Sequence, residues 1–176
     1  MQDEVRVHMH PVRAEQLMML AEQWQCNSTE AVERLIRERI SAGDLPDSTP
    51  GLEVSAFGNL VAFKIDFDRT PPMSWEQALK ISQALGQLAT GRTNGFRCAY
   101  SEDTSLIFMR NSDEGFTVSF AAPGDTRSKT VTQGILEDLT RQFKAAALAA
   151  KANKTGESQK AGAAYGKSKD TTEMRA

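Results

Sequence analysis

Long apolar runs, cysteines, histidines and aromatic residues are all scarce in this chain. Its 176 residues include two cysteines, two histidines and 7% aromatic residues. No apolar run approaches the ~20 residues that a membrane-spanning helix requires. The two cysteines, Cys26 and Cys98, form no C-x-x-C motif and fall in different parts of the chain. We therefore expect neither a membrane span nor a disulfide framework nor a zinc site, and we expect a cytoplasmic protein.

Residues that could carry catalysis do not form a recognised pattern. Beyond residue 45 there is no histidine and no glycine-rich phosphate loop ending in Lys-Ser/Thr. Glu102 and Asp103 lie in a predicted turn, where acidic side chains are expected for turn chemistry alone. His8 and His10 could share an ion, but a metal site needs three or four ligands. The sequence therefore predicts no enzyme, no cofactor and no metal site.

Two changes in composition divide the chain. The stretch LPDSTPG, residues 45–51, has two prolines, a glycine and short polar residues, as linkers and turns do. From residue 151 onward the chain has one aromatic residue, Tyr165, and no leucine, isoleucine or valine. Such a segment buries too little surface to offset its ordering entropy. The sequence predicts domains at 1–44 and 52–150, a linker at 45–51 and a disordered tail at 151–176.

The N-terminal domain reads as a strand followed by two helices. EVRVHMHP alternates apolar and polar residues, and Pro11 then suits the first turn of a helix. Asn27 with Glu30 predicts the start of a second helix, which Gly43 ends. About forty residues are too few for a stable core, so we expect two copies to pair their strands and share one core. Its predicted members are Val5, Val7, Met9, Leu17, Trp24, Val32, Leu35 and Ile36.

These features resemble the ribbon-helix-helix DNA-binding proteins of the Arc, MetJ and CopG type. The resemblance covers residues 4–42 and rests on the strand VRVHM, the following proline, the helix ending LAEQWQ, the turn CNSTE and the apolar AVERLI. It implies a homodimer whose β-ribbon enters the major groove of double-stranded DNA. The base-contacting candidates it implies are Arg6, His8 and Glu4, while His10 falls where the strand meets the helix. The phosphate-contacting candidates are Asn27, Ser28 and Thr29 at the second helix N-terminus.

The second domain is predicted as ββαβββα, so the chain as a whole is expected to be α+β. Apolar alternation over 52–68 around Gly58-Asn59 predicts a hairpin, and Ser74 with Gln77 predicts the start of a helix that ends before Gly91. FRCAY, SLIFMR and GFTVSFA read as strands. A last helix begins at Thr130 or Thr132. We expect this domain to serve oligomerisation, ligand sensing or binding of a protein partner.

Together these patterns favour a sequence-specific DNA-binding protein, most simply a transcriptional repressor of bacterial or mobile-element type. Two dimers would bind cooperatively to a repeated or palindromic operator, giving a tetramer or higher assembly on DNA. One alternative is an accessory protein at a plasmid transfer or partition site. Another is an antitoxin that neutralises a protein partner. Residues 1–44 carry five basic and eight acidic residues, net −3, so a broad basic field is not expected.

Overall fold

The chain forms two compact units that divide between Asp47 and Ser48, inside the predicted linker 45–51. The computed structural model describes residues 7–111 and 115–166, with side chains described as far as Thr155 in the last helix. Each unit makes its own internal contacts.

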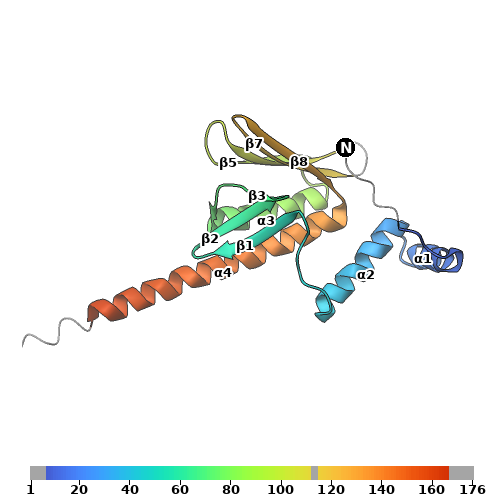
Figure 1. The fold of residues 1–176 in the computed structure, drawn as a ribbon, viewed down its shortest axis with the longest axis horizontal. Helices are drawn as coiled ribbons and strands as arrows, with labels where there is room; N and C mark the ends of the chain where they lie inside the picture. Colours follow the sequence, from blue (N-terminus) through green and yellow to red (C-terminus); the bar gives the residue numbers. More distant parts are fainter. Residues whose placement is uncertain (1–6, 112–114, 167–176) are drawn as a thin grey trace, which may run out of the picture. The chain divides into compact units, whose positions relative to one another are not determined.

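The N-terminal unit is a pair of helices, α1 (Pro11–Gln23) and α2 (Ser28–Ala42), drawn in blue in Figure 1. Pro11 begins α1, and the His10 side chain accepts a hydrogen bond from the Val12 amide. Asn27 caps α2, and Gly43 ends it in the left-handed conformation (φ 83°) that glycine adopts without steric cost. The predicted starts of both helices and the end of α2 are confirmed, whereas α1 ends at Gln23, two residues before the end of the predicted LAEQWQ.

The predicted β-α-α order of this unit is wrong. The unit opens with α1 and α2, and the described residues before them, 7–10, belong to no strand. A strand exists only where its backbone N–H and C=O groups meet a neighbouring strand, and no described segment pairs with 7–10. His10 has extended backbone angles (φ −61°, ψ 137°) but serves as the cap of α1. The alternation of apolar and polar side chains is therefore not sufficient to form a strand at residues 7–10.

The C-terminal unit contains two antiparallel sheets and two helices. Sheet A consists of β1 (Leu52–Phe57), β2 (Leu60–Ile65), β3 (Asp68–Arg69) and β4 (Met73–Ser74). Sheet B is a meander of β5 (Gly95–Ala99), β6 (Ser105–Arg110), β7 (Phe116–Ala122) and β8 (Asp125–Val131). The helices are α3 (Trp75–Ala89) and α4 (Gln133–Gly166). The predicted α+β class is correct, whereas ββαβββα omitted β3, β4 and β8 and merged two sheets into one.

Several local predictions for this unit are confirmed. Gly58 and Asn59 form the turn of the β1–β2 hairpin, with Phe57 opposite Leu60. The Ser74 side chain accepts from the Gln77 amide at 3.2 Å, and the Gln77 side chain accepts from the Ser74 amide at 3.1 Å, which together form a capping box for α3.

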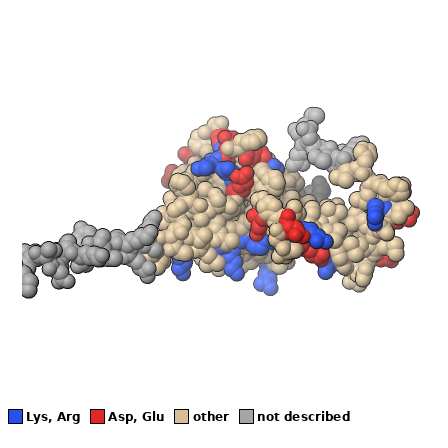
Figure 2. All heavy atoms as spheres, turned by 60° about the horizontal axis from the view of Figure 1, so that its bottom comes forward, with Lys and Arg blue, Asp and Glu red and all other residues tan. Residues whose placement is uncertain are grey.

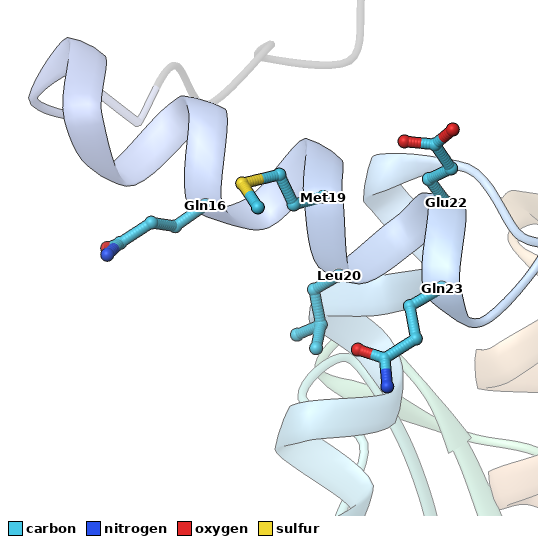
Figure 3. Close-up of a pocket in the computed structure, with 5 residues that line it drawn as sticks. All are labelled: Gln16, Met19, Leu20, Glu22 and Gln23. Carbon is cyan, nitrogen blue, oxygen red and sulfur yellow. The ribbon is translucent and has the colours of Figure 1, made fainter.

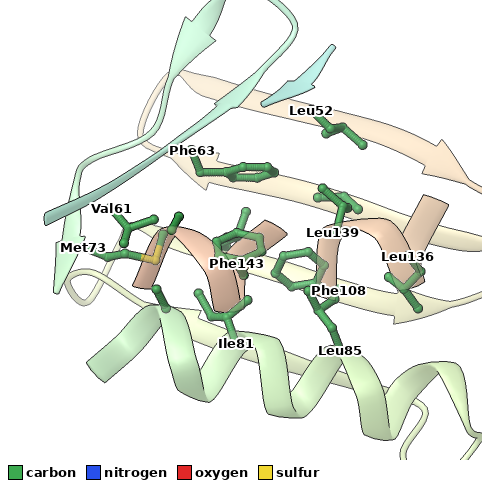
Figure 4. Close-up of a cluster of buried hydrophobic side chains, with 14 of the residues drawn as sticks. Leu52, Val61, Phe63, Met73, Ile81, Leu85, Phe108, Leu136, Leu139 and Phe143 are labelled. Carbon is green, nitrogen blue, oxygen red and sulfur yellow. The ribbon is translucent and has the colours of Figure 1, made fainter. Parts of the chain in front are cut away.

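One hydrophobic core joins the two sheets and the two helices. In Figure 4, Phe63 of sheet A, Phe108 of sheet B, Ile81 of α3 and Phe143 of α4 point toward one another. All four are buried, and the rings of Phe63 and Phe143 lie 5.2 Å apart. The unit thus has the complete interior that a stable domain requires.

Helix α4 is longer than the core that it helps to form. Its buried residues recur from Gly134 to Ala150, while residues 151–155 are exposed. The helix nevertheless continues to Gly166, so the prediction of disorder from residue 151 is wrong as far as that residue, and 167–176 lie outside the described residues. Alanine is the strongest helix former, and it recurs through this segment. Helix propensity therefore favours α4 here, although the segment buries little apolar surface.

Candidate functional site on the helix pair

The helix pair leaves most of its large apolar side chains open to solvent. Only Ala21 and Ala31 are buried in α1 and α2. Met19 is 68% exposed and Ile36 is 46% exposed. The other exposed large apolar residues of this unit are Val7, Met9, Val12, Met18, Val32, Leu35 and Leu45. Such a concentration in one small unit is typical of a surface that another molecule covers.

A cation–π contact joins the two helices. The guanidinium of Arg34 in α2 lies 4.2 Å from the centre of the Trp24 ring, at the end of α1. Arg34 also pairs with Glu38 one turn further along α2, at 3.7 Å. These contacts cover one face of Trp24 and fix the C-terminal end of α1 against α2.

A shallow hollow of about 530 Å³ lies on the surface of α1. Its lining side chains, shown in Figure 3, come from Gln16, Met19, Leu20, Glu22 and Gln23. Because a single helix lines it, the hollow is too open to enclose a small molecule. Its apolar floor suits a protruding side chain of another protein surface.

The polar candidates of this unit occupy two places. His8 is exposed before α1, whereas Glu4, Arg6 and Val5 lie outside the described residues. Asn27, Ser28 and Thr29 are exposed at the N-terminus of α2. The structure therefore describes only part of the predicted base-reading set.

The Asn27 side chain is already engaged in capping. Its Oδ1 accepts from the Glu30 amide at 2.9 Å, while Glu30 Oε2 accepts from the Asn27 amide at 3.0 Å. The hydroxyl groups of Ser28 and Thr29 are consequently the exposed polar side-chain groups best placed to meet an anion at this helix end.

On the face shown in Figure 2, basic and acidic residues lie in small groups separated by uncharged surface. In the part of the chain that the structure describes, no group of three or more histidine, cysteine, aspartate or glutamate residues is arranged to hold a metal ion. Within the same residues, no helix has the length and hydropathy that a bilayer crossing needs.

The predicted dimer-core residues fall into two groups. Leu17 and Trp24 are half-buried, whereas Val7, Met9, Val32, Leu35 and Ile36 are exposed. The exposed Met19 and the hollow beside it were not predicted, because the predicted core took only Leu17 and Trp24 from the region of the first helix. The run of two methionines and a leucine at 18–20 was the available signal, since it widens the apolar surface of the helix.

No protein-family model, curated protein or solved structure matches this chain.

Proposed function

We propose that the protein binds DNA sequence-specifically as a homodimer formed through its helix pair, and that it acts as a transcriptional repressor. The observation that carries the proposal is the open apolar surface of α1 and α2, on which only two alanines are buried. A unit of this size needs a second source of apolar surface to be stable. A second copy supplies the same surface and so completes a symmetric interface.

The DNA contacts in this proposal come from two segments of the N-terminal unit. The segment before α1 carries Arg6 and His8, whose side chains can read base edges, and Glu4, which can accept from a cytosine amino group. The start of α2 carries Ser28 and Thr29, which can contact phosphate. A dimer presents two copies of each segment to the DNA. Residues 1–44 carry five basic and eight acidic residues, which favours recognition through a few defined contacts over a broad electrostatic field.

A footprint on the DNA surrounding the protein's own gene tests this function. At about 0.1–0.15 M salt, the wild type should protect a repeated or palindromic site. Arg6→Ala should weaken that binding by roughly 1–3 kcal/mol and relax the preference at one base position. A protected site over the gene's own promoter would support repression. A protected site at a transfer or partition locus would support an accessory role instead.

Arg13→Ala is the matched control. Arg13 carries the same charge, is exposed on α1 and already bonds Gln16 through its guanidinium at 2.7 Å. Its loss should leave the protected sequence unchanged. Weak binding that ignores sequence, equal in all three proteins, would refute the proposal.

A further inference from the structure

One stretch of α4, residues 139–156, contains four basic residues and no acidic residue. Three of them, Lys144, Lys151 and Lys154, are exposed. Lys144 and Lys151 are seven residues apart, close to two helical turns, and so they lie on the same side of the helix, about 10 Å apart along its axis. Lys154 follows within one further turn. These three lysines form a basic row, which we call the α4 lysine row.

The α4 lysine row retains most of its positive charge. Arg141, the fourth basic residue of the stretch, pairs with Asp138 at 3.0 Å. Within the described residues, by contrast, Lys144 makes no hydrogen bond or ion pair. Lys151 lies over the Trp75 ring, 4.9 Å from its centre, and because an ammonium group has three donors it can also meet an anion.

One carboxylate lies near the far end of the row. The pKa of Glu76, at the start of α3, is lowered by a backbone hydrogen bond and, less strongly, by the nearby charges of Lys154 and Lys151. Three lysines thus meet one carboxylate, and the row remains positive. A surface of this kind suits an anionic ligand with several charges.

The exposed side of α4 offers little to a lipid surface. In the part of α4 whose side chains are described, Leu148 is the only large apolar residue that is exposed, at 50%. A helix that lies on a bilayer needs a broad apolar face opposite its polar one, and the apolar face of α4 is already buried in the core of its unit. The surface therefore favours the phosphate backbone of a nucleic acid over a membrane.

The N-terminal unit lacks the cations that DNA binding usually requires, since residues 1–44 carry more acidic than basic residues. Phosphate contacts nevertheless supply much of the affinity of DNA-binding proteins. Figure 1 shows α4 extending past the sheets and α3 of its own unit, as an extended surface would require. We infer that the α4 lysine row contacts the phosphate backbone of the DNA that the helix pair binds. The inference rests on the proposed function, because it takes double-stranded DNA as the ligand.

The salt dependence of DNA binding tests this inference. A fluorescent duplex of random sequence is titrated with the full-length protein at salt concentrations from about 0.05 to 0.2 M, and binding is followed by anisotropy. Each phosphate contact adds about 0.9 to the slope of the logarithm of the binding constant against the logarithm of the salt concentration. Lys144→Gln with Lys151→Gln should therefore reduce that slope by about 1.8. Lys144→Arg with Lys151→Arg, which keeps both charges, should retain the wild-type slope.

Lys80→Gln with Arg92→Gln is the matched control. Both residues are exposed in the C-terminal unit and lie outside α4, and their replacement removes the same two charges. The slope should stay at its wild-type value. Far-ultraviolet circular dichroism checks that each variant is folded.

An unchanged slope in the variant with glutamine at 144 and 151 would overturn the inference, and so would an equal reduction in the control. Binding to vesicles of anionic lipid without binding to the duplex would overturn it as well. The footprint on the protein's own gene reports the proposed function separately. A random duplex bound through the α4 lysine row, together with no protected site in the footprint, would refute sequence-specific recognition and still support the phosphate contacts.

Discussion

The Gln142 side chain of α4 donates a hydrogen bond from Nε2 to the Thr49 hydroxyl at 3.1 Å, across 93 positions of sequence. Both residues are buried, with 6% and 8% exposure. The bond ties the segment that leads into β1 to the first third of the last helix. A buried polar pair of this kind is costly to disrupt, because the remaining partner loses both the bond and its water.

Gln142→Leu should therefore destabilise the C-terminal unit by about 1–3 kcal/mol. Denaturant unfolding monitored by circular dichroism measures the change. Gln133→Leu is the control on the same helix, since Gln133 is exposed and bonds only at the surface to Glu137. It should change the unfolding free energy by less than about 0.5 kcal/mol. Equal losses of unfolding free energy in the two variants would mean that the buried Gln142–Thr49 pair does not stabilise the unit.

Leu35→Glu should abolish the helix-pair dimer and, with it, the stability that the shared apolar surface gives the N-terminal unit. A carboxylate placed in a shared apolar interface would lose its hydration without gaining a partner. Leu45→Glu makes the same change at a similar exposure, 44% against 40%, but outside both helices. Cross-linking through the N-terminal unit should be lost in the first variant and kept in the second. If both variants cross-link as the wild type does, the apolar surface of α2 is not the dimer contact.

Gly95→Ala should destabilise sheet B by roughly 1–3 kcal/mol, the usual cost of overpacking. A Cβ atom at Gly95 would lie 2.8 Å from the Phe108 carbonyl oxygen, and backbone can yield only by moving β5 away from β6. At Gly115 the nearest atoms to such a Cβ are 3.5 Å away, an ordinary contact. Thermal unfolding should thus distinguish the two alanine variants, with Gly115→Ala close to the wild type.

Tyr100 should ionise at an unusually high pH. Burial raises its pKa to about 12, although the nearby Thr70 hydroxyl, 3.4 Å away, acts in the opposite direction. The folded state thus holds the phenol proton more tightly than the unfolded state, whose tyrosine pKa is near 10. The stabilisation is fully present below pH 10 and is lost as the pH rises from about 10 to about 12.

The difference in unfolding free energy between the wild type and Tyr100→Phe isolates this contribution from other groups that titrate in the same range. It should change by roughly 2–3 kcal/mol across that interval, at about 1.4 kcal/mol per pKa unit. A difference that stays constant with pH would contradict the burial of the hydroxyl group.

Local signals in the sequence were sufficient for the helix limits. Asn27, Ser74 and Gly43 determine where α2 and α3 begin and where α2 ends, because caps act through neighbouring residues alone. The sequence signal for the β1–β2 turn, Gly58-Asn59, is also local. These features needed no knowledge of the rest of the fold.

Features that depend on distant partners were not predictable in this way. The sequence of strand β8, DTRSKTV, is polar, and the strand was not predicted. Its inward residues Arg127 and Lys129 pair with Asp68 and Asp66, which lie about sixty residues earlier in the chain. The predicted N-terminal strand failed for the opposite reason, since its alternation was present but no described segment pairs with 7–10. The candidate site shows the same division: the capped end of α2 was predictable, whereas the hollow beside Met19 was not.

The packing of α4 on β1 has a consequence for the order of events during protein synthesis. These are the last and first elements of the C-terminal unit, so its interior cannot close until α4 has left the ribosome. The helix pair emerges first and makes its contacts within 47 residues. Its apolar surface is then available to a neighbouring nascent chain while the C-terminal unit is still unfinished. Chains made on one messenger RNA could thus begin to assemble before either is complete.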